Sequence, residues 1–340
     1  MKAVVKQKRG DGFVDLAEAP EPQCAEGEML VRVGYAGICG SDIMMLHDRF
    51  PSYNPPVIMG HEFAGTVESL GSGVSGFSVG DRVACETHAY VCGECGYCRS
   101  GLYNLCPDRK GFGYGVDGAF ARFVSVRKGI VHHLPDEIQD REAAVLEPLS
   151  VAVNALTRNS RIIAGESVLV IGPGPIGLLC LQLGRLGGSA VTVVGTEHSR
   201  VRLSAASKMG AESVMTDTEL KEELAAGRLS DSFDSVVITT GEPSSFETAL
   251  KAARRNGRVV HIGESTDRAS FQFSLLERKN LTVQGSFSHN WPVWEAAISL
   301  VKEGRVDLLS LVTHEVGISD WKEAFRLTES REGMKVLIRP

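Results

Sequence analysis

The sequence lacks the features that mark membrane-spanning, secreted and nucleic-acid-binding proteins. It has no apolar run of about 18 residues, which a transmembrane helix would need. The segment that begins at Met1 has no apolar signal-peptide core. Basic residues are not in excess, because 36 Lys and Arg stand against 42 Asp and Glu, a net charge of −6. We therefore expect a cytoplasmic protein with no nucleic-acid or membrane partner.

Internal repeats and low-complexity segments are also absent from the 340 residues. This length accommodates about two domains. Hydrophobic residues make up 43% of the chain and charged residues 23%, as in ordinary globular proteins. We therefore expect two folded domains.

Half of the eight cysteines fall within one short segment, Cys92-x2-Cys95-x2-Cys98-x7-Cys106. Clustered cysteines in a cytosolic chain bind metal more often than they form disulfides. Four thiolates at short C-x2-C spacing suit a closed, tetrahedral, structural zinc site. An iron–sulfur cluster is the alternative, but no long-range cysteine pattern supports it. We therefore expect a structural zinc ion bound by these four residues.

A glycine-rich turn lies at the centre of the sequence. The aliphatic run Ser167–Ile171 predicts a buried strand, and a helical apolar pattern covers Ile176–Leu186. Between them lies a G-x-G-x-x-G turn, whose residues include Gly172, Gly174, Pro175, Ile176 and Gly177. Such glycines allow a tight turn, the close approach of a pyrophosphate, and packing of the helix on the strand. A turn without a ligand is the alternative, but a second strand at Ala190–Val194 favours a dinucleotide site.

The pattern of residues changes twice along the chain. Up to about residue 85, and again from about 110 to 135, short runs punctuated by glycine predict a compact, largely antiparallel barrel. Its predicted strands include Met29–Val33, Gly65–Glu68 and Ala119–Val126. Alternating strands and helices from about 150 to 285 predict a doubly wound parallel sheet, and hence an α/β fold. We place the domains at 1–150, completed by 290–340, and at 151–289.

Within the doubly wound region, further predicted strands are Ser235–Thr239, Arg258–Ile262 and Leu281–Val283, and predicted helices are Arg200–Met209 and Ser245–Ala253. In the tail, the predicted elements are the helices Trp294–Lys302 and Asp320–Thr328 and a last strand, Lys335–Ile338.

Several motifs, taken in order, resemble those of the zinc-containing medium-chain alcohol dehydrogenases. They are Gly37-Ile-Cys39-Gly-Ser41-Asp42, Gly60-His61-Glu62-x2-Gly65-x5-Gly71-x2-Val74, the four-cysteine segment, Asp117-Gly-Ala-Phe-Ala121 and the glycine-rich turn. The resemblance covers nearly the whole chain. It implies a GroES-like β-barrel catalytic domain beside a Rossmann nucleotide-binding domain, with catalysis in the cleft between them.

The resemblance also implies a second zinc ion, with one coordination position open for water or substrate. By motif, Cys39 and His61 are its first two protein ligands. The third falls in Glu147-Pro-Leu-Ser-Val151. Classical alcohol dehydrogenases have cysteine at the position of Glu147, and this run instead looks like the sorbitol (polyol) dehydrogenase branch. There Glu147 binds directly or through water, and Glu62 lies close to the metal or exchanges at it. The alternative for Glu147 is a solvated carboxylate at a helix end.

Zinc makes an alcohol hydroxyl acidic enough to lose its proton, so that hydride can pass to a nicotinamide. By resemblance, Ser41 passes this proton outward, while Asp42 positions the loop. Many relatives have a histidine at the end of this relay where the sequence has Met44. His47 is either a surface residue, which we favour, or a substitute relay.

The loop after the second predicted strand bears on the choice of cofactor. An acidic residue at the end of that strand would bind the ribose and repel a 2′-phosphate. Here Glu197 comes one residue late, while Thr196, Ser199 and Arg200 offer partners to a 2′-phosphate. We favour NADP slightly over NAD. Gly241 and Gly263 follow later strands and are either cofactor contacts or plain turns.

Together these features predict a zinc- and NAD(P)-dependent dehydrogenase that interconverts a secondary alcohol and its ketone. The alcohol is expected to be a polyol, a sugar alcohol or a sugar acid. One rival is oxidation of an amino alcohol, as by threonine dehydrogenase, and another is a non-catalytic, zinc-stabilised binding or redox-sensing protein. Relatives pair the edge strand near Leu281 across a two-fold axis, so we expect a homodimer or homotetramer.

Overall fold

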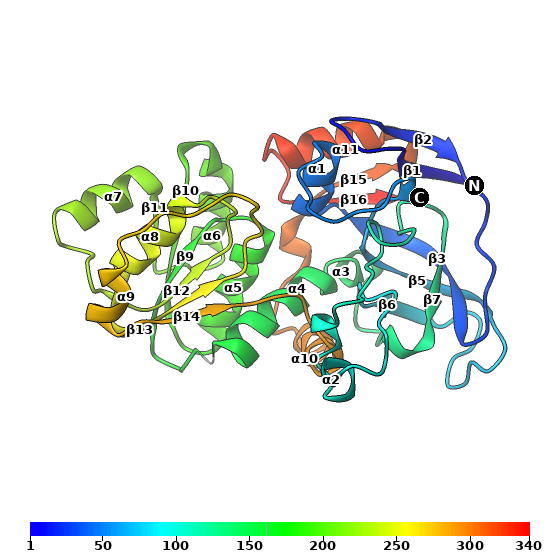
Figure 1. Ribbon diagram of the computed structural model, residues 1–340, viewed down its shortest axis with the longest axis horizontal. Coiled ribbons are helices and arrows are strands. Elements are labelled where there is room, and N and C mark those ends of the chain that lie inside the picture. Colours follow the sequence, from blue (N-terminus) through cyan, green and yellow to red (C-terminus); the bar gives the residue numbers. More distant parts are fainter. Residues whose placement is uncertain (161) are drawn as a thin grey trace. The chain divides into compact units, whose positions relative to one another are not determined.

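The computed structural model describes residues 1–160 and 162–340 and divides into two compact units (Figure 1). The first unit joins Met1–Ser150 to His289–Pro340, and the second is Val151–Ser288. The second unit is therefore an insertion between two segments of the first. Within the described part of the chain, every helix is too short or too polar to cross a bilayer.

The first unit is built on a seven-stranded mixed sheet. Its strand order is β15-β16-β3-β5-β6-β8, and β7 also pairs with β3. Only the pair β15 and β16 is parallel. The strands are β3 (Glu28–Gly37), β5 (Glu62–Leu70), β6 (Arg82–Cys85), β7 (Phe123–Arg127), β8 (Val131–His133), β15 (Val312–Gly317) and β16 (Lys335–Arg339).

A smaller antiparallel sheet and several helices complete this unit. The small sheet has the order β2-β1-β4, from β1 (Lys2–Lys6), β2 (Val14–Glu18) and β4 (Val57–Ile58). Its α-helices are α1 (Gly40–Leu46), α2 (Gly96–Arg99), α3 (Asp140–Ala143), α10 (Trp291–Lys302) and α11 (Trp321–Glu329), and α4 (Leu146–Val153) begins here. The short 3-10 turns are η1 (Tyr103–Leu105), η2 (Lys128–Ile130), η5 (Leu309–Leu311) and η6 (Ile318–Asp320).

The second unit is a six-stranded, wholly parallel sheet in the order β11-β10-β9-β12-β13-β14. Figure 1 shows helices on both sides of it. The strands are β9 (Ser167–Ile171), β10 (Ala190–Gly195), β11 (Ser213–Thr216), β12 (Phe233–Ile238), β13 (Ala253–His261) and β14 (Thr282–Gly285). The helices are α5 (Pro175–Leu186), α6 (Arg200–Lys208), α7 (Asp217–Ala225), α8 (Ser244–Ala252) and α9 (Ser274–Lys279), with η3 (Asn154–Asn159) and η4 (Glu197–Ser199). The predicted α/β fold with a doubly wound parallel sheet is confirmed.

Some strands differ from those predicted. The edge strand β11 was not predicted, because its residues are exposed or half-buried and their sequence shows no core pattern. The predicted strand 119–126 is too long, since β7 begins only at Phe123. Residues 119–121 are buried without forming part of that strand, so an apolar run there reflects burial alone.

The turn between β9 and α5 depends on two glycines for steric reasons. Gly172 has a φ of +113°, in the region that side chains disfavour. A Cβ on Gly177 would lie 1.8 Å from the carbonyl oxygen of Gly172, so only glycine lets the helix approach the strand this closely. Gly174 differs, since its φ is −70° and a Cβ there would meet nothing within 4 Å.

We therefore predict that alanine destabilises the protein much more at position 177 than at position 174. Gly177→Ala must displace the backbone and should lower the free energy of unfolding by about 1–3 kcal/mol, as overpacking does. Gly174→Ala should lower it by less than about 1 kcal/mol, because no atom is displaced. Urea unfolding of the two variants checks this. Equal stability of both variants would contradict the assigned close contact.

His47, at the carboxyl end of α1, links the first turn of the chain to α11. Its Nδ1 lies 2.7 Å from Asp11 Oδ1, and its Nε2 lies 2.7 Å from Glu329 Oε1. Both partners are carboxylates, so both ring nitrogens donate when the imidazole is protonated. Burial alone would lower the pKa of His47, but the hydrogen bonds to Asp11 and Glu329 raise it above its ordinary value. This arrangement favours the surface role of His47 over a proton relay.

The raised pKa of His47 fixes how its contribution to stability depends on pH. The stabilisation is fully present below the ordinary pKa of about 6.5 and is lost as the pH rises through the folded-state value. His47→Gln should therefore destabilise the protein more at pH 6 than at pH 9. The difference should stay below about 1 kcal/mol, because the pairs are partly exposed. Urea unfolding at both pH values checks this, and an equal loss at both would be the contrary result.

Candidate active site and metal centres

The pairing of β3 with β5 brings Cys39, His61 and Glu62 together. Gly37 at the end of β3 lies opposite Glu62 at the start of β5 in the antiparallel register. Cys39 follows β3 and His61 precedes β5, so both side chains arise at the same end of the pair. The ligand atoms of the three residues lie within 4.8 Å of one another. His61 and Glu62 are buried, and Cys39 is half-buried.

Asp42 and Ser41, in the first turn of α1, surround His61. Asp42 is fully buried, and its Oδ2 accepts the backbone N–H of Cys39 at 2.9 Å. Ser41 Oγ lies 3.3 Å from His61 Nε2. Burial alone would lower the pKa of His61, but the negative charges of Asp42 and Cys39 raise it well above its usual value.

Two buried atoms of this group suggest that a cation belongs beside His61. Asp42 Oδ1 and His61 Nδ1 lie 3.7 Å apart, and neither has a hydrogen-bond partner among the described residues. A histidine that binds metal through one ring nitrogen usually donates from the other to a carboxylate. Metal on His61 Nε2 would place a proton on Nδ1, facing Asp42. The residues present therefore fit a bound metal ion.

The Glu62 carboxylate is held from the opposite side by Lys335, the first residue of β16. Lys335 Nζ lies 2.5 Å from Glu62 Oε2 and 3.2 Å from the carbonyl oxygen of Ile38. Both side chains are almost wholly buried. Burial alone would lower the pKa of Lys335, but Glu62 and the nearby Cys39 raise it. Lys335 is therefore a charged partner that fixes one oxygen of Glu62.

Glu147, in the first turn of α4, lies outside the group of three ligand atoms, although its charge contributes to the raised pKa of His61. Glu147 is 8% exposed, so its carboxylate is not solvated. Glu147 Oε1 lies 3.1 Å from His289 Nε2. Burial would raise the pKa of Glu147, but the hydrogen bond from His289 and nearby positive charges lower it. Glu147 is thus held in its anionic form next to the group.

A third cluster of possible ligands consists of Glu86, His88 and His289, all buried. Its atoms are already engaged with the protein. Glu86 accepts the hydroxyl of Tyr103 at 2.8 Å, and His88 Nε2 lies 2.8 Å from the carbonyl oxygen of His289. Arg127 donates to the His88 carbonyl oxygen, adding positive charge nearby. We interpret this cluster as a hydrogen-bond network and not as a metal site.

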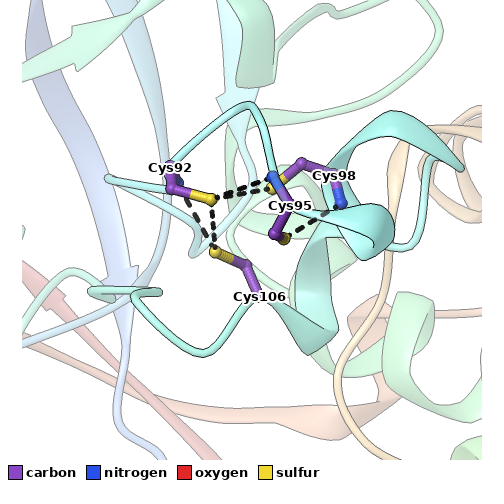
Figure 2. A group of neighbouring side chains, drawn as sticks. All are labelled: Cys92, Cys95, Cys98 and Cys106. Carbon is purple, nitrogen blue, oxygen red and sulfur yellow. Dashed lines mark hydrogen bonds between the residues drawn. The ribbon is translucent and has the colours of Figure 1, made fainter.

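Figure 2 shows the four clustered cysteines with their sulfur atoms pointing toward one another. Cys92 Sγ lies 3.9 Å from Cys98 Sγ and 3.6 Å from Cys106 Sγ. Tetrahedral zinc with Zn–S bonds of about 2.3 Å would place sulfurs ~3.8 Å apart. The backbone N–H of Cys95 donates to Cys92 Sγ and, with that of Glu94, lowers the pKa of Cys92 to about 7. All eight cysteines are unpaired thiols, so this cluster fits zinc and contains no disulfide.

In the second unit, the glycine turn fits the pyrophosphate of a dinucleotide. Pro175 and Ile176 begin α5, whose N-cap is Gly174. The φ of Gly174 is one that any residue adopts, and a Cβ there would meet no protein atom within 4 Å. The open space at its Cα therefore suits the close approach of a ligand. The free N–H groups of the helix N-terminus favour an anion there.

Beyond β10, the residues that bear on NAD or NADP interact with each other. Arg200 Nη2 lies 2.6 Å from Glu197 Oε2, and both side chains are exposed. Thr196 Oγ1 lies 3.1 Å from Ser199 Oγ. Glu197, which would bind the ribose of NAD, and Arg200, which would bind the 2′-phosphate of NADP, thus form an exposed ion pair with each other.

Gly241 and Gly263 lie in loops that touch after β12 and β13. A Cβ on Gly241 would lie 2.2 Å from the carbonyl oxygen of Glu264, and one on Gly263 would lie 2.1 Å from that of Thr240. Close packing of the two loops accounts for both glycines without a ligand.

Sequence analysis assigned no role to four side chains that contact the candidate site or its partners, namely those of Lys335, His289, His88 and Trp294. Lys335 is separated from Glu62 by 273 positions, and His289 from Glu147 by 142. Isolated residues of these types carry no spacing signal, and only the fold brings them to their partners.

Two family models match the chain. The model described as alcohol dehydrogenase GroES-like domain matches residues 25–136, and the model described as zinc-binding dehydrogenase matches residues 175–303. The first match lies in the first unit, and the second begins at the start of α5, covers the parallel sheet from β10 to β14, and extends into α10 of the first unit.

Curated relatives match the chain along nearly its whole length. A sorbitol dehydrogenase of Halalkalibacterium halodurans is 39% identical, with 100% of this chain and 99% of the relative covered. A D-arabitol-phosphate dehydrogenase of Enterococcus avium is 34% identical, with 99% and 97% covered. An L-threonine 3-dehydrogenase of Pyrococcus horikoshii is also 34% identical, with 99% and 98% covered.

Solved structures give the same family. The RspB alcohol dehydrogenase of Escherichia coli, complexed with NADH, has a TM-score of 0.91 at 26% identity, with 100% of this chain and 99% of that chain covered. A zinc-binding dehydrogenase of Sinorhizobium meliloti, bound to NADP, has a TM-score of 0.91 at 27% identity, with the same coverage. The chain belongs to the zinc-containing medium-chain alcohol dehydrogenase family, in its sorbitol and polyol dehydrogenase-like branch.

Proposed function

We propose that the protein is a zinc- and NAD(P)-dependent dehydrogenase that interconverts a polyol, or another secondary alcohol of a sugar or sugar acid, and its ketone. The observation that carries this proposal is the convergence of Cys39, His61 and Glu62 within 4.8 Å. Three buried carboxylates (Asp42, Glu62 and Glu147) lie in or beside this group, and Lys335 and the protonated form of His61 offset only part of their charge. This excess of negative charge favours a bound divalent cation.

Cys39, His61, Glu62 and Glu147 are the residues that would hold the catalytic zinc ion, and Cys92, Cys95, Cys98 and Cys106 would hold the structural one. When bound, the catalytic zinc would act as a Lewis acid on the alcohol, and the nicotinamide would accept the hydride. Thiolate and imidazole are good zinc ligands, while the harder carboxylates make the metal more exchangeable.

Ser41 is the residue that we propose for moving the hydroxyl proton away from the substrate. Its Oγ lies 3.3 Å from His61 Nε2, at the edge of the ligand group. Met44 cannot continue a relay, and both ring nitrogens of His47 are engaged by carboxylates. We propose that the proton leaves Ser41 through water.

The relatives' names support a polyol substrate, because they include a sorbitol and an arabitol-phosphate dehydrogenase. For the cofactor, we propose NADP in preference to NAD, with Arg200 leaving Glu197 to meet the 2′-phosphate. Arg and phosphate form charge-assisted bidentate hydrogen bonds, which supports this role. Glu197 is the competing partner that would instead favour NAD.

We also propose a cytoplasmic homodimer or homotetramer. The edge strand β14 has all four residues exposed, so its free edge is open to pairing with a second copy across a two-fold axis. The eight unpaired thiols support the cytoplasmic location.

The substrate screen should use polyols, polyol phosphates, aldonates and amino alcohols, each with NAD and with NADP. We expect the highest kcat/KM for a polyol or polyol phosphate, with NADP preferred. Formation of the reduced nicotinamide, followed by its absorbance, is the measurement. Highest turnover of L-threonine would instead support the amino-alcohol alternative, and a large preference for NAD would refute the role given to Arg200. Turnover of none of these compounds would favour a non-catalytic protein.

The two cysteine sites should respond differently to serine. Cys39→Ser should remove one zinc ion per chain and abolish turnover while the protein stays folded, because only the open site loses a ligand. Cys98→Ser should first lower thermal stability and yield, since a structural zinc contributes directly to folding. Zinc content, melting temperature and kcat of both variants check this. Turnover retained by Cys39→Ser would refute the catalytic assignment.

A further inference from the structure

His289 connects the Glu147 carboxylate to the indole of Trp294 in α10. Trp294 Nε1 lies 2.8 Å from His289 Nδ1, and His289 Nε2 lies 3.1 Å from Glu147 Oε1. Trp294 and His289 are wholly buried. The three side chains thus form one hydrogen-bonded chain from helix α10 to helix α4. Its central imidazole is shielded from solvent.

The chemistry of the partners determines where the proton of His289 lies. An indole N–H can only donate, so His289 Nδ1 must accept and carries no hydrogen. A neutral imidazole then carries its hydrogen on Nε2, which faces Glu147. His289 therefore donates to Glu147 Oε1, and Trp294 selects the tautomer that makes this possible.

The backbone of His289 is held as firmly as its ring. Its carbonyl oxygen accepts from His88 Nε2 at 2.8 Å. On the carboxyl side, Asn290 Nδ2 donates to the carbonyl oxygen of Gly101 at 3.0 Å, and the backbone N–H of Trp291 donates to Tyr103 Oη at 2.6 Å. The position of the imidazole is thus fixed by the rest of the first unit, independently of Glu147.

We propose that His289, set in one tautomer by Trp294, is a positioning residue for Glu147. It holds Oε1 so that the other oxygen, Oε2, is turned toward the metal or its bound water. This inference rests on the proposed function, since it gives Glu147 a role at the catalytic zinc. His289 does not touch the reacting atoms and acts through Glu147 alone.

The test compares zinc affinity in three variants of the holoenzyme, by release of zinc to buffers of defined free zinc concentration. His289→Leu removes the donor and should weaken the more exchangeable site about 10- to 100-fold, as expected when a group that orients a ligand is lost. His289→Gln retains an N–H at the position of Nε2 and should keep most of the affinity. Trp294→Phe should weaken zinc binding at this site as well, because His289 Nδ1 loses its donor and the imidazole can then adopt either tautomer.

The four-cysteine site provides an internal control, since its affinity should stay unchanged in every variant. Trp291→Phe is the matched control for Trp294→Phe, because Trp291 lies on the same helix and also stacks on His132, whereas the indole that donates to His289 is that of Trp294. It should leave both zinc affinities unchanged. Replacement of the exchangeable zinc by Co²⁺ should give a changed visible spectrum in His289→Leu and the wild-type spectrum in His289→Gln.

A second readout needs neither metal nor turnover. In enzyme labelled with ¹⁵N-histidine, the signals missing from His289→Gln belong to His289, and they should show hydrogen on Nε2 and none on Nδ1. Hydrogen on Nδ1 would overturn the inference. If His289→Leu does not fold, the comparison of Trp294→Phe with Trp291→Phe tests the inference instead. Equal affinity of these two variants for the exchangeable zinc would overturn the inference.

The outcomes separate this inference from the proposed function. A wild-type enzyme that binds two zinc ions and turns over, beside unchanged affinity in His289→Leu, contradicts the role of His289 alone. A wild-type enzyme that binds only the four-cysteine zinc contradicts both.

Discussion

The candidate active site depends on an imbalance of buried charge. Asp42, Glu62 and Glu147 are carboxylates in the interior of the first unit, and Cys39 adds a half-buried thiol. Lys335, which pairs with Glu62, and His61, which lies beside Asp42 and has a raised pKa, offset part of this charge. Burying unpaired charge is costly, and burial raises the pKa of Asp42 and of Glu62, so further positive charge would stabilise the ionised group. A divalent zinc ion between Cys39 and His61 would supply it.

The surrounding contacts all serve to hold these anions in place. Lys335 fixes one oxygen of Glu62, and His289 fixes one oxygen of Glu147. In each case the proposed function gives the second oxygen the task of meeting a metal or its water. The partners come from β16 and from the segment before α10, which belong to the part of the chain that follows the inserted second unit. The first unit therefore needs both of its segments to form the site.

Features that are local in sequence could be predicted, and features that depend on distant contacts could not. The four clustered cysteines span residues 92–106, and the glycine turn spans 172–177, so each motif carries its own spacing. The alternation of strands and helices likewise predicted the parallel sheet. His289 and Lys335 could not be predicted, because each is an isolated residue whose role comes from a partner more than 100 positions away. The edge strand β11 was missed because it has no buried face to give a periodic pattern.

The most direct measurement of the central claim is anomalous scattering at the zinc absorption edge from crystals of the purified protein. The account predicts two peaks per chain, one among the four clustered cysteines and one within bonding distance of Cys39 Sγ and His61 Nε2. A single peak at the four cysteines, with no ion between Cys39 and His61, would contradict it.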